Sequence, residues 1–261
     1  MENTCWTNGI PTLDAKDRIL TKLLLDAPEL DDKVIEMVRQ NLESVPERFV
    51  SCVSTLRSLV TNRPPIRFCA LQVLLDLCIN PNDKMRRTSI VAVKKWNSNQ
   101  NDINDRVESF AVEALHILSQ PKDIVMTEEE EEETGWTEKD VVRHAELYFV
   151  LCTKKPSLLK QLFLLYVEAS EQVKEHIRSH MINMIKSIGM RSQDLVRLIK
   201  EFPSGSESLV IRILSILCES KSPTREIIAA VKAIAPLAEE RSIDMSSISP
   251  ILSGQSLSQG T

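Results

Sequence analysis

Short breaks rich in proline and asparagine divide this chain into segments whose apolar residues recur at every third or fourth position. Asn62-Arg63-Pro64-Pro65 and Asn80-Pro81-Asn82 are two such breaks. Apolar residues at steps of three and four lie on one face of an α-helix, and proline stops a helix because it lacks the amide hydrogen. The pattern therefore predicts a series of amphipathic helices, each roughly 12–17 residues long.

The composition favours an all-α protein. The 43% apolar content supplies a core, while the chain holds only 6 glycines and 4% aromatic residues. Strand-rich proteins need Gly-rich turns and alternating β-branched residues, and neither pattern occurs in this sequence. No apolar run reaches ~18 residues, so no membrane helix is expected, and the start shows no signal peptide. The six cysteines include no Cys-x-x-Cys pair, which predicts buried, reduced thiols.

The predicted helices recur in pairs about every 35–40 residues. One helix hairpin cannot bury its apolar face alone, whereas stacked hairpins bury each other's faces. The expected fold is therefore an all-α, HEAT-like superhelical array of antiparallel helix hairpins, with a globular all-α bundle as the competing fold. The predicted helices span residues 14–25, 31–42, 47–60, 66–79, 83–96, 102–118, 137–152, 157–169, 170–188, 194–201, 206–219, 224–235 and 242–252.

One acidic segment interrupts the array. Residues 120–135 contain six consecutive glutamates, Glu128 to Glu133, and few apolar positions, which predicts a disordered loop. Helical hairpins are expected on both sides, over residues 12–119 and 136–252, as one continuing array. A disordered lead, 1–11, and a frayed tail, 253–261, are expected at the ends.

Several unlike motifs of this chain follow one another in an order that resembles the central part of the symplekin family. The motifs that carry the resemblance are Gly-Trp-Thr-Glu (135–138), the helix 141–152, Leu165-Tyr166-Val167-Glu168-Ala169, Ile188-Gly189-Met190-Arg191-Ser192-Gln193-Asp194-Leu195 and Pro203-Ser204-Gly205-Ser206-Glu207-Ser208-Leu209-Val210. Shorter matches precede them, at 16–27, 54–59, 73–77 and 83–86, so the resemblance covers most of the chain.

The resemblance implies a non-catalytic scaffold of the nuclear machinery that cleaves and polyadenylates pre-mRNA. Proteins of that family hold the endonuclease subunit and its inactive homologue, and link them to polyadenylation factors. The expected partners are therefore these protein subunits, with no cofactor, small-molecule substrate or membrane. The alternatives are an RNA-contacting helical-repeat module and a helical-repeat scaffold of another nuclear complex.

A basic stretch is the best candidate for a binding surface that the residues themselves suggest. It consists of Lys84, Arg86, Arg87, Lys94 and Lys95 on the helix predicted over 83–96. The net charge of −5 argues against a general electrostatic grip on nucleic acid. These side chains are either a solvated helix face or a local contact for RNA or an acidic protein.

No motif predicts an enzyme or a metal site. His176 and His180 lie four residues apart, a spacing that can ligate zinc, but the internal glutamate of His-Glu-x-x-His is absent and no third ligand is evident. A metal-dependent hydrolase that uses these two histidines is therefore the least favoured hypothesis. Gly-x-Ser-x-Gly and phosphate-cradling glycine loops are also missing from the sequence.

Overall fold

The computed structural model describes residues 18–94, 96, 100–122, 135–219, 223–240 and 246. These residues form thirteen α-helices and short 3₁₀ turns, with no strand among them, so the all-α prediction is confirmed. The predicted lead (1–11), the glutamate run and the frayed tail (253–261) lie outside the described residues, as does the helix expected over 242–252 apart from Ser246. No described helix is long and apolar enough to span a lipid bilayer.

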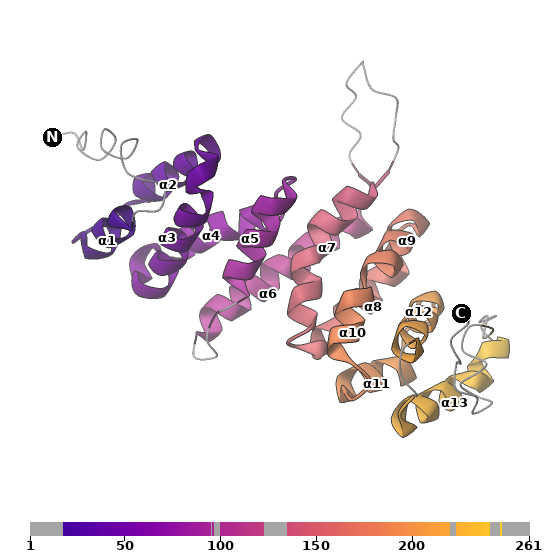
Figure 1. Cartoon of the computed structure of the whole chain (residues 1–261). Helices are drawn as coiled ribbons and strands as arrows, with labels where there is room; N and C mark the ends of the chain where they lie inside the picture. Colours follow the sequence, from indigo (N-terminus) through magenta and orange to yellow (C-terminus); the bar gives the residue numbers. More distant parts are fainter. Residues whose placement is uncertain are drawn as a thin grey trace, which may run out of the picture. The chain divides into compact units, whose positions relative to one another are not determined.

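The chain divides into two compact units, of which the first ends at Val107 and the second begins at Glu108. The boundary falls within helix α6 (Asn101–His116). The earlier helices, coloured indigo to magenta in Figure 1, are α1 (Ile19–Asp26), α2 (Asp32–Ser44), α3 (Phe49–Asn62), α4 (Arg67–Leu77) and α5 (Asp83–Val93).

Helices of the first unit pack on their neighbours in the chain and on the helices two positions away. Helix α3 contacts α1 and α5 as well as α2 and α4, and α2 also contacts α4. The core between them is aliphatic, and Leu56, Leu59, Leu71 and Leu74 are fully buried there. Burial of each such side chain contributes roughly 1.5–3 kcal/mol to folding, so the packing of neighbours stabilises each helix.

The helices after the unit boundary are joined by short turns. They are α7 (Glu138–Cys152), α8 (Leu159–Glu168), α9 (Glu171–His180), α10 (Ile182–Ile188), α11 (Gln193–Lys200), α12 (Glu207–Cys218) and α13 (Arg225–Glu240). The side chains of Thr137 and Ser170 cap α7 and α9. Gly189 ends α10 with a positive φ of 72°.

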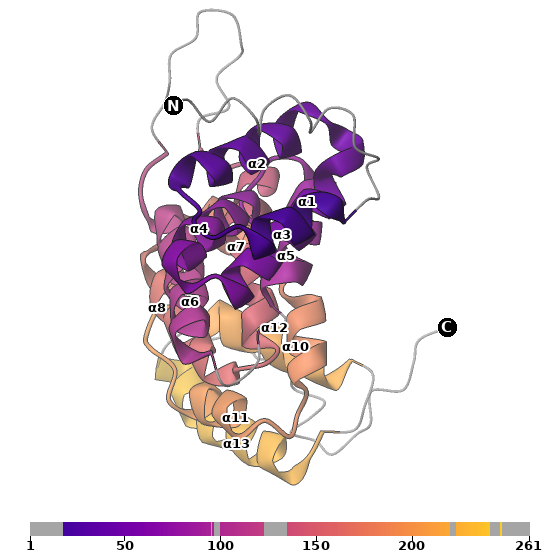
Figure 2. The same ribbon diagram turned by 90° about the vertical axis from the view of Figure 1, so that its left-hand side faces the viewer.

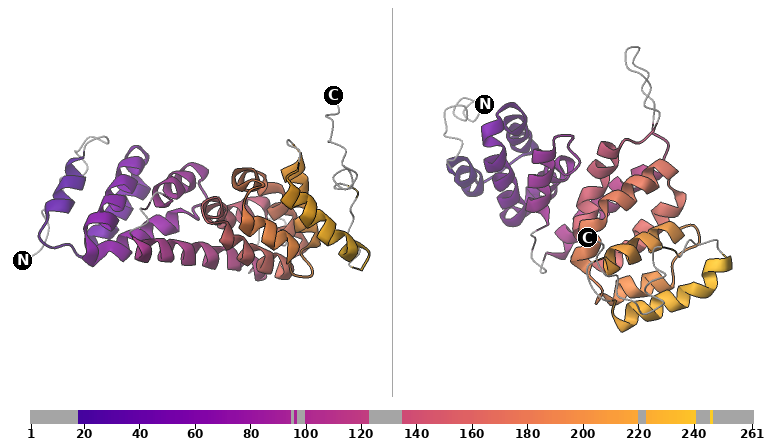
Figure 3. Two further views of the ribbon diagram at one scale, coloured as in Figure 1. Left: turned by 90° about the horizontal axis from the view of Figure 1, so that it is seen from below. Right: turned by 45° about the vertical axis from the view of Figure 1, so that its right-hand side comes forward.

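In the second unit, helices that do not follow each other in the chain pack against one another. Helix α10 contacts both α7 and α12, whereas α11 contacts both α8 and α13, and Figure 2 shows α11 beside α13. The same succession of helices can be followed along the chain in Figure 3. Tyr148, Tyr166 and Phe163 are the largest fully buried side chains of this unit. The packing therefore leaves one face of α8 and one face of α11 next to each other.

The helix predicted over 170–188 is broken at Met181 into α9 and α10. The Nε of Arg212 lies 3.4 Å from the carbonyl oxygen of Arg178, to which it donates. That oxygen is the acceptor that the amide of Ile182 would use in a continuous helix. A side chain from α12 thus competes for the backbone bond at the break.

Two other sequence predictions were wrong in detail. Pro236 was expected to end its helix, but α13 continues to Glu240 and includes Pro236, which is exposed. Ile19, Leu20, Leu23 and Leu24 recur at helical spacing, which predicts an inward face, yet Ile19 and Leu23 are 43% and 46% exposed. Helix α1 is covered by α3 on one side, so only Leu24 of its apolar residues is fully buried.

Candidate functional site

The structure does not bring the five predicted basic residues into one patch. Lys84 and Arg87 are exposed on α5, whereas Lys94 is half-buried at the C-terminal cap of that helix. Arg86 is buried, and Lys95 lies outside the described residues. Lys84 and Arg87 are three residues apart and therefore share one side of α5.

Arg86 is buried and hydrogen-bonded within the protein. Its side chain is only 3% exposed. One guanidinium nitrogen donates to the carbonyl oxygen of Asn80 at 3.0 Å, and the other donates to Oδ1 of Asp83 at 2.6 Å. Arg86 therefore joins α5 to the preceding turn, and a phosphate would have to displace these bonds to reach it.

Trp96 packs on a neighbouring helix. The guanidinium of Arg57, on α3, lies over the indole ring, 5.6 Å from the ring centroid. Because a cation covers this face of the ring, it is not free to stack on a nucleic-acid base.

His176 and His180 both lie on α9. The Nε2 of His180 lies 2.7 Å from Oε1 of Glu138 on α7. Within the described part of the chain, no group of three or more His, Cys, Asp or Glu side chains is arranged to hold a metal ion. The His180–Glu138 contact joins the two helices across the second unit.

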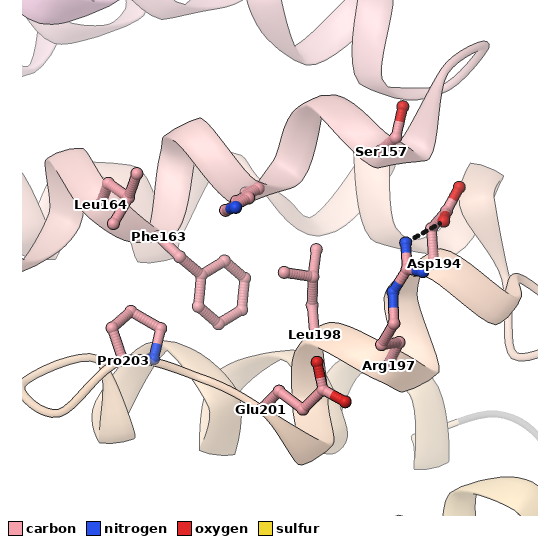
Figure 4. Close-up of a pocket in the computed structure, with 9 residues that line it drawn as sticks. Ser157, Phe163, Leu164, Asp194, Arg197, Leu198, Glu201 and Pro203 are labelled. Atoms are coloured by element: carbon pink, nitrogen blue, oxygen red, sulfur yellow. Dashed lines mark hydrogen bonds and ion pairs between the residues drawn. The ribbon is translucent and has the colours of Figure 1, made fainter.

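A groove lies between α8 and α11 in the second unit (Figure 4). It encloses about 480 Å³. Ser157 and Asp194 lie at one end and Leu164 and Pro203 at the other, so the two helices run in the same direction along it. Its lining residues are Ser157, Lys160, Phe163, Leu164, Asp194, Arg197, Leu198, Glu201 and Pro203.

Local sequence signals position both walls of this groove. Pro156 opens the 3₁₀ turn Pro156–Leu158 that leads into α8. On the other side, Gly189 ends α10, and the side chain of Ser192 caps α11 by accepting from the amide of Leu195 at 3.3 Å. These signals start α8 and α11 at the same end of the groove.

The floor of the groove is apolar. Phe163 is fully buried beneath it, and Leu164 beside it is 43% exposed. Val167, one turn further along α8, is also exposed, and its Cγ1 lies 3.4 Å from where a Cβ on Gly205 would stand. The exposed apolar strip of α8 therefore continues past the groove towards the turn that precedes α12. Aliphatic side chains exposed in this way favour a contact with another apolar surface.

The rim of the groove is charged. Arg197 and Asp194 neutralise each other at 2.8 Å on the α11 side. Lys160 on α8 and Glu201 at the end of α11 are exposed and have no ion-pair partner among the described residues. The rim thus offers one uncompensated charge of each sign to a bound molecule.

A cluster of polar side chains lies at the start of α7. The indole Nε1 of Trp136 donates to the carbonyl oxygen of Gln120 at 2.9 Å, and Nζ of Lys122 lies 2.7 Å from Oδ2 of Asp140. Burial raises the pKa of Asp140, but hydrogen bonds from Lys122 and Thr137 together lower it by more than burial raises it. The pKa of Asp140 therefore lies below its ordinary value. These contacts fasten the described residues before and after the glutamate run to each other.

Sequence reasoning missed the groove. Its walls are 30 or more residues apart in the chain, and only their tertiary pairing creates the site. The available signal was the run Phe163-Leu164-Leu165-Tyr166-Val167, which is too apolar for a helix buried on one face.

No protein-family model matches this chain, and no solved structure matches it significantly. The fold class thus comes from the structure itself, and the functional assignment is a proposal.

Proposed function

We propose that this chain is a non-catalytic protein-interaction scaffold of the symplekin family, built as a HEAT-like stack of antiparallel helix hairpins. In this proposal it acts in the nucleus, in the cleavage and polyadenylation of pre-mRNA. It docks the endonuclease subunit and its inactive homologue, together with polyadenylation factors, and it needs no cofactor.

The location of the shared motifs supports the family assignment. Gly135–Glu138 forms the start and cap of α7, Ile188–Leu195 forms the turn from α10 to α11, and Pro203–Val210 forms the turn into α12. The motifs therefore set where helices begin and end. Residues with that role are expected in a scaffold whose helix positions, rather than a reactive group, determine what it binds.

Contacts between helices that do not follow each other in the chain support the proposed stack. In each unit, helices two or three positions apart in the chain contact each other, as hairpins do when they are laid side by side. Such an arrangement leaves outer helix faces uncovered. The observation that best supports protein binding is the groove between α8 and α11, where an apolar floor reaches solvent.

Retention by the endonuclease pair tests this proposal. The full chain should co-purify with the tagged endonuclease subunit and its inactive homologue at moderate salt, and it should elute with them in size-exclusion chromatography. Resin that carries the tag alone is the control. A chain that elutes separately from a folded, active endonuclease pair would contradict the proposed partners.

RNA contact is the second candidate, because Lys84 and Arg87 are both exposed on one side of α5. Reversing both charges with Lys84→Glu and Arg87→Glu should then weaken salt-dependent binding to single-stranded RNA. Arg86→Glu is unsuitable for this test, because it would place a carboxylate beside Asp83 in a buried position. Binding that is unchanged in the double variant would eliminate this candidate.

A further inference from the structure

The groove between α8 and α11 has the dimensions of a short helix. Asp194 and Glu201 both line it and are seven residues apart, which corresponds to about 10 Å along α11 at ~1.5 Å per residue. That length accommodates about two helical turns. The volume of about 480 Å³ is sufficient for a few aliphatic side chains but not for a folded domain.

A helical occupant fits this site better than an extended one. Some extended peptides pair their backbone with the free edge of a sheet, and the described residues contain no strand. Others dock as a polyproline II helix on exposed aromatic side chains, whereas the aromatic residue that lines this groove, Phe163, is fully buried. Backbone groups in the middle of α8 and α11 are hydrogen-bonded within each helix, so there the groove presents side chains to an occupant. An amphipathic helix satisfies its own backbone and presents aliphatic residues at i, i+3, i+4 and i+7.

The uncompensated rim charges define the flanks of that helix. Lys160 lies on the α8 wall and Glu201 at the end of the α11 wall. The apolar side chains of Phe163 and Leu198 lie between the two helices (Figure 4). An acidic residue on one flank of the occupant would meet Lys160, and a basic residue on the other flank would meet Glu201. Because Asp194 and Arg197 already neutralise each other, they favour neither an acidic nor a basic residue on the bound helix.

We infer that this groove binds an amphipathic helix of a partner protein, about two turns long, with an aliphatic stripe between one acidic and one basic flank. This inference rests on the proposed protein-binding function, but it does not depend on which machinery supplies the partner. The aliphatic stripe covers Leu164 and Leu198, and the flanking charges determine which helices are accepted.

Three synthetic helical peptides test the inference in the full chain. Each has about 16 residues, alanine-rich and with the same leucine stripe. The first has glutamates on one flank and lysines on the other, the second has glutamates on both flanks, and the third has lysines on both. Fluorescence anisotropy should show that the chain binds the mixed peptide about fivefold more tightly than either of the others.

Single charge reversals should then change which peptide is preferred. Glu201→Lys leaves two positive rim residues and should favour the all-glutamate peptide over the mixed one, whereas Lys160→Glu should favour the all-lysine peptide. Glu168→Lys and Lys200→Glu are matched controls, because they make the same charge changes on exposed positions of α8 and α11 outside the groove. These controls should keep the preference for the mixed peptide.

The apolar floor is tested by Leu164→Glu, which alters an exposed position and leaves the core intact. This substitution should weaken binding of the mixed peptide at least tenfold, while the circular dichroism spectrum and the melting temperature of the chain stay unchanged. Equal binding of all three peptides, or an unchanged preference in both rim variants, would overturn the inference. So would peptide binding that appears only when residues 241–261 are removed, or a chain that dimerises through Leu164, since the occupant would then be its own tail or a second copy.

The outcomes separate this inference from the proposed function. A charge-selective groove in a chain that ignores the endonuclease pair would contradict the proposed machinery alone. An endonuclease pair that binds wild-type and Leu164→Glu chains equally, together with peptides that do not bind, would contradict the helix-binding groove alone.

Discussion

Gly189 has a backbone conformation that other amino acids rarely adopt. Its φ of 72° and ψ of 172° fall in a region that glycine occupies almost exclusively, and nothing lies within 4 Å of where its Cβ would be. Gly189→Ala should therefore lower the free energy of unfolding by about 1–3 kcal/mol through backbone strain alone. Urea denaturation measures this, with exposed Ser187→Ala as the control, and equal stability of the two variants would contradict it.

His144 should make stability depend on pH. Burial lowers its pKa below the ordinary 6.5, although the carbonyl of Asp140 partly opposes this and the charge of Arg143 adds to it. The folded chain thus resists protonation more than the unfolded chain, so the free energy of unfolding should fall as pH drops below about 6.5. Replacing this side chain in His144→Gln should reduce that fall, as measured by urea denaturation at neutral and mildly acidic pH. Identical pH dependence in both proteins would show that this site does not contribute.

Helix α11 should depend on its cap, because it is only 8 residues long. Ser192→Ala removes the side chain that accepts from the amide of Leu195, and it should cost about 1 kcal/mol of stability. Ser215→Ala, which removes a hydroxyl that bonds within α12, is the control and should change stability by less than ~0.5 kcal/mol. A cap variant as stable as this control would indicate that α11 is held by packing alone.

Helix starts could be predicted from the sequence more reliably than helix faces. Asp31, Thr137 and Ser170 act through their own side chains on the following turn, so their effect is local and readable. The exposure of Leu23 depends instead on which helices cover α1. The break at Met181 was equally unpredictable, since it involves Arg212 from a distant helix. The spacing of apolar residues identifies the apolar face of a helix but not the helix that packs against it.

The candidate sites likewise combine features that can be read from the sequence with features that only the fold of the whole molecule creates. The charges of the basic stretch could be read from the sequence, but the burial of Arg86 could not, because its partners come from the fold around it. The groove was not predicted at all, since Lys160 and Glu201 line one groove only once α8 has packed against α11. The all-α class needed no such tertiary information.

A crosslinking map of the chain within a native cleavage and polyadenylation complex tests the proposed scaffold most directly. We predict that lysines on outer faces of the second unit, with Lys160 and Lys200 among them, crosslink to the endonuclease subunit or to its inactive homologue. A complex whose other subunits crosslink to one another, while no lysine of this chain crosslinks to any of them, would contradict the proposal.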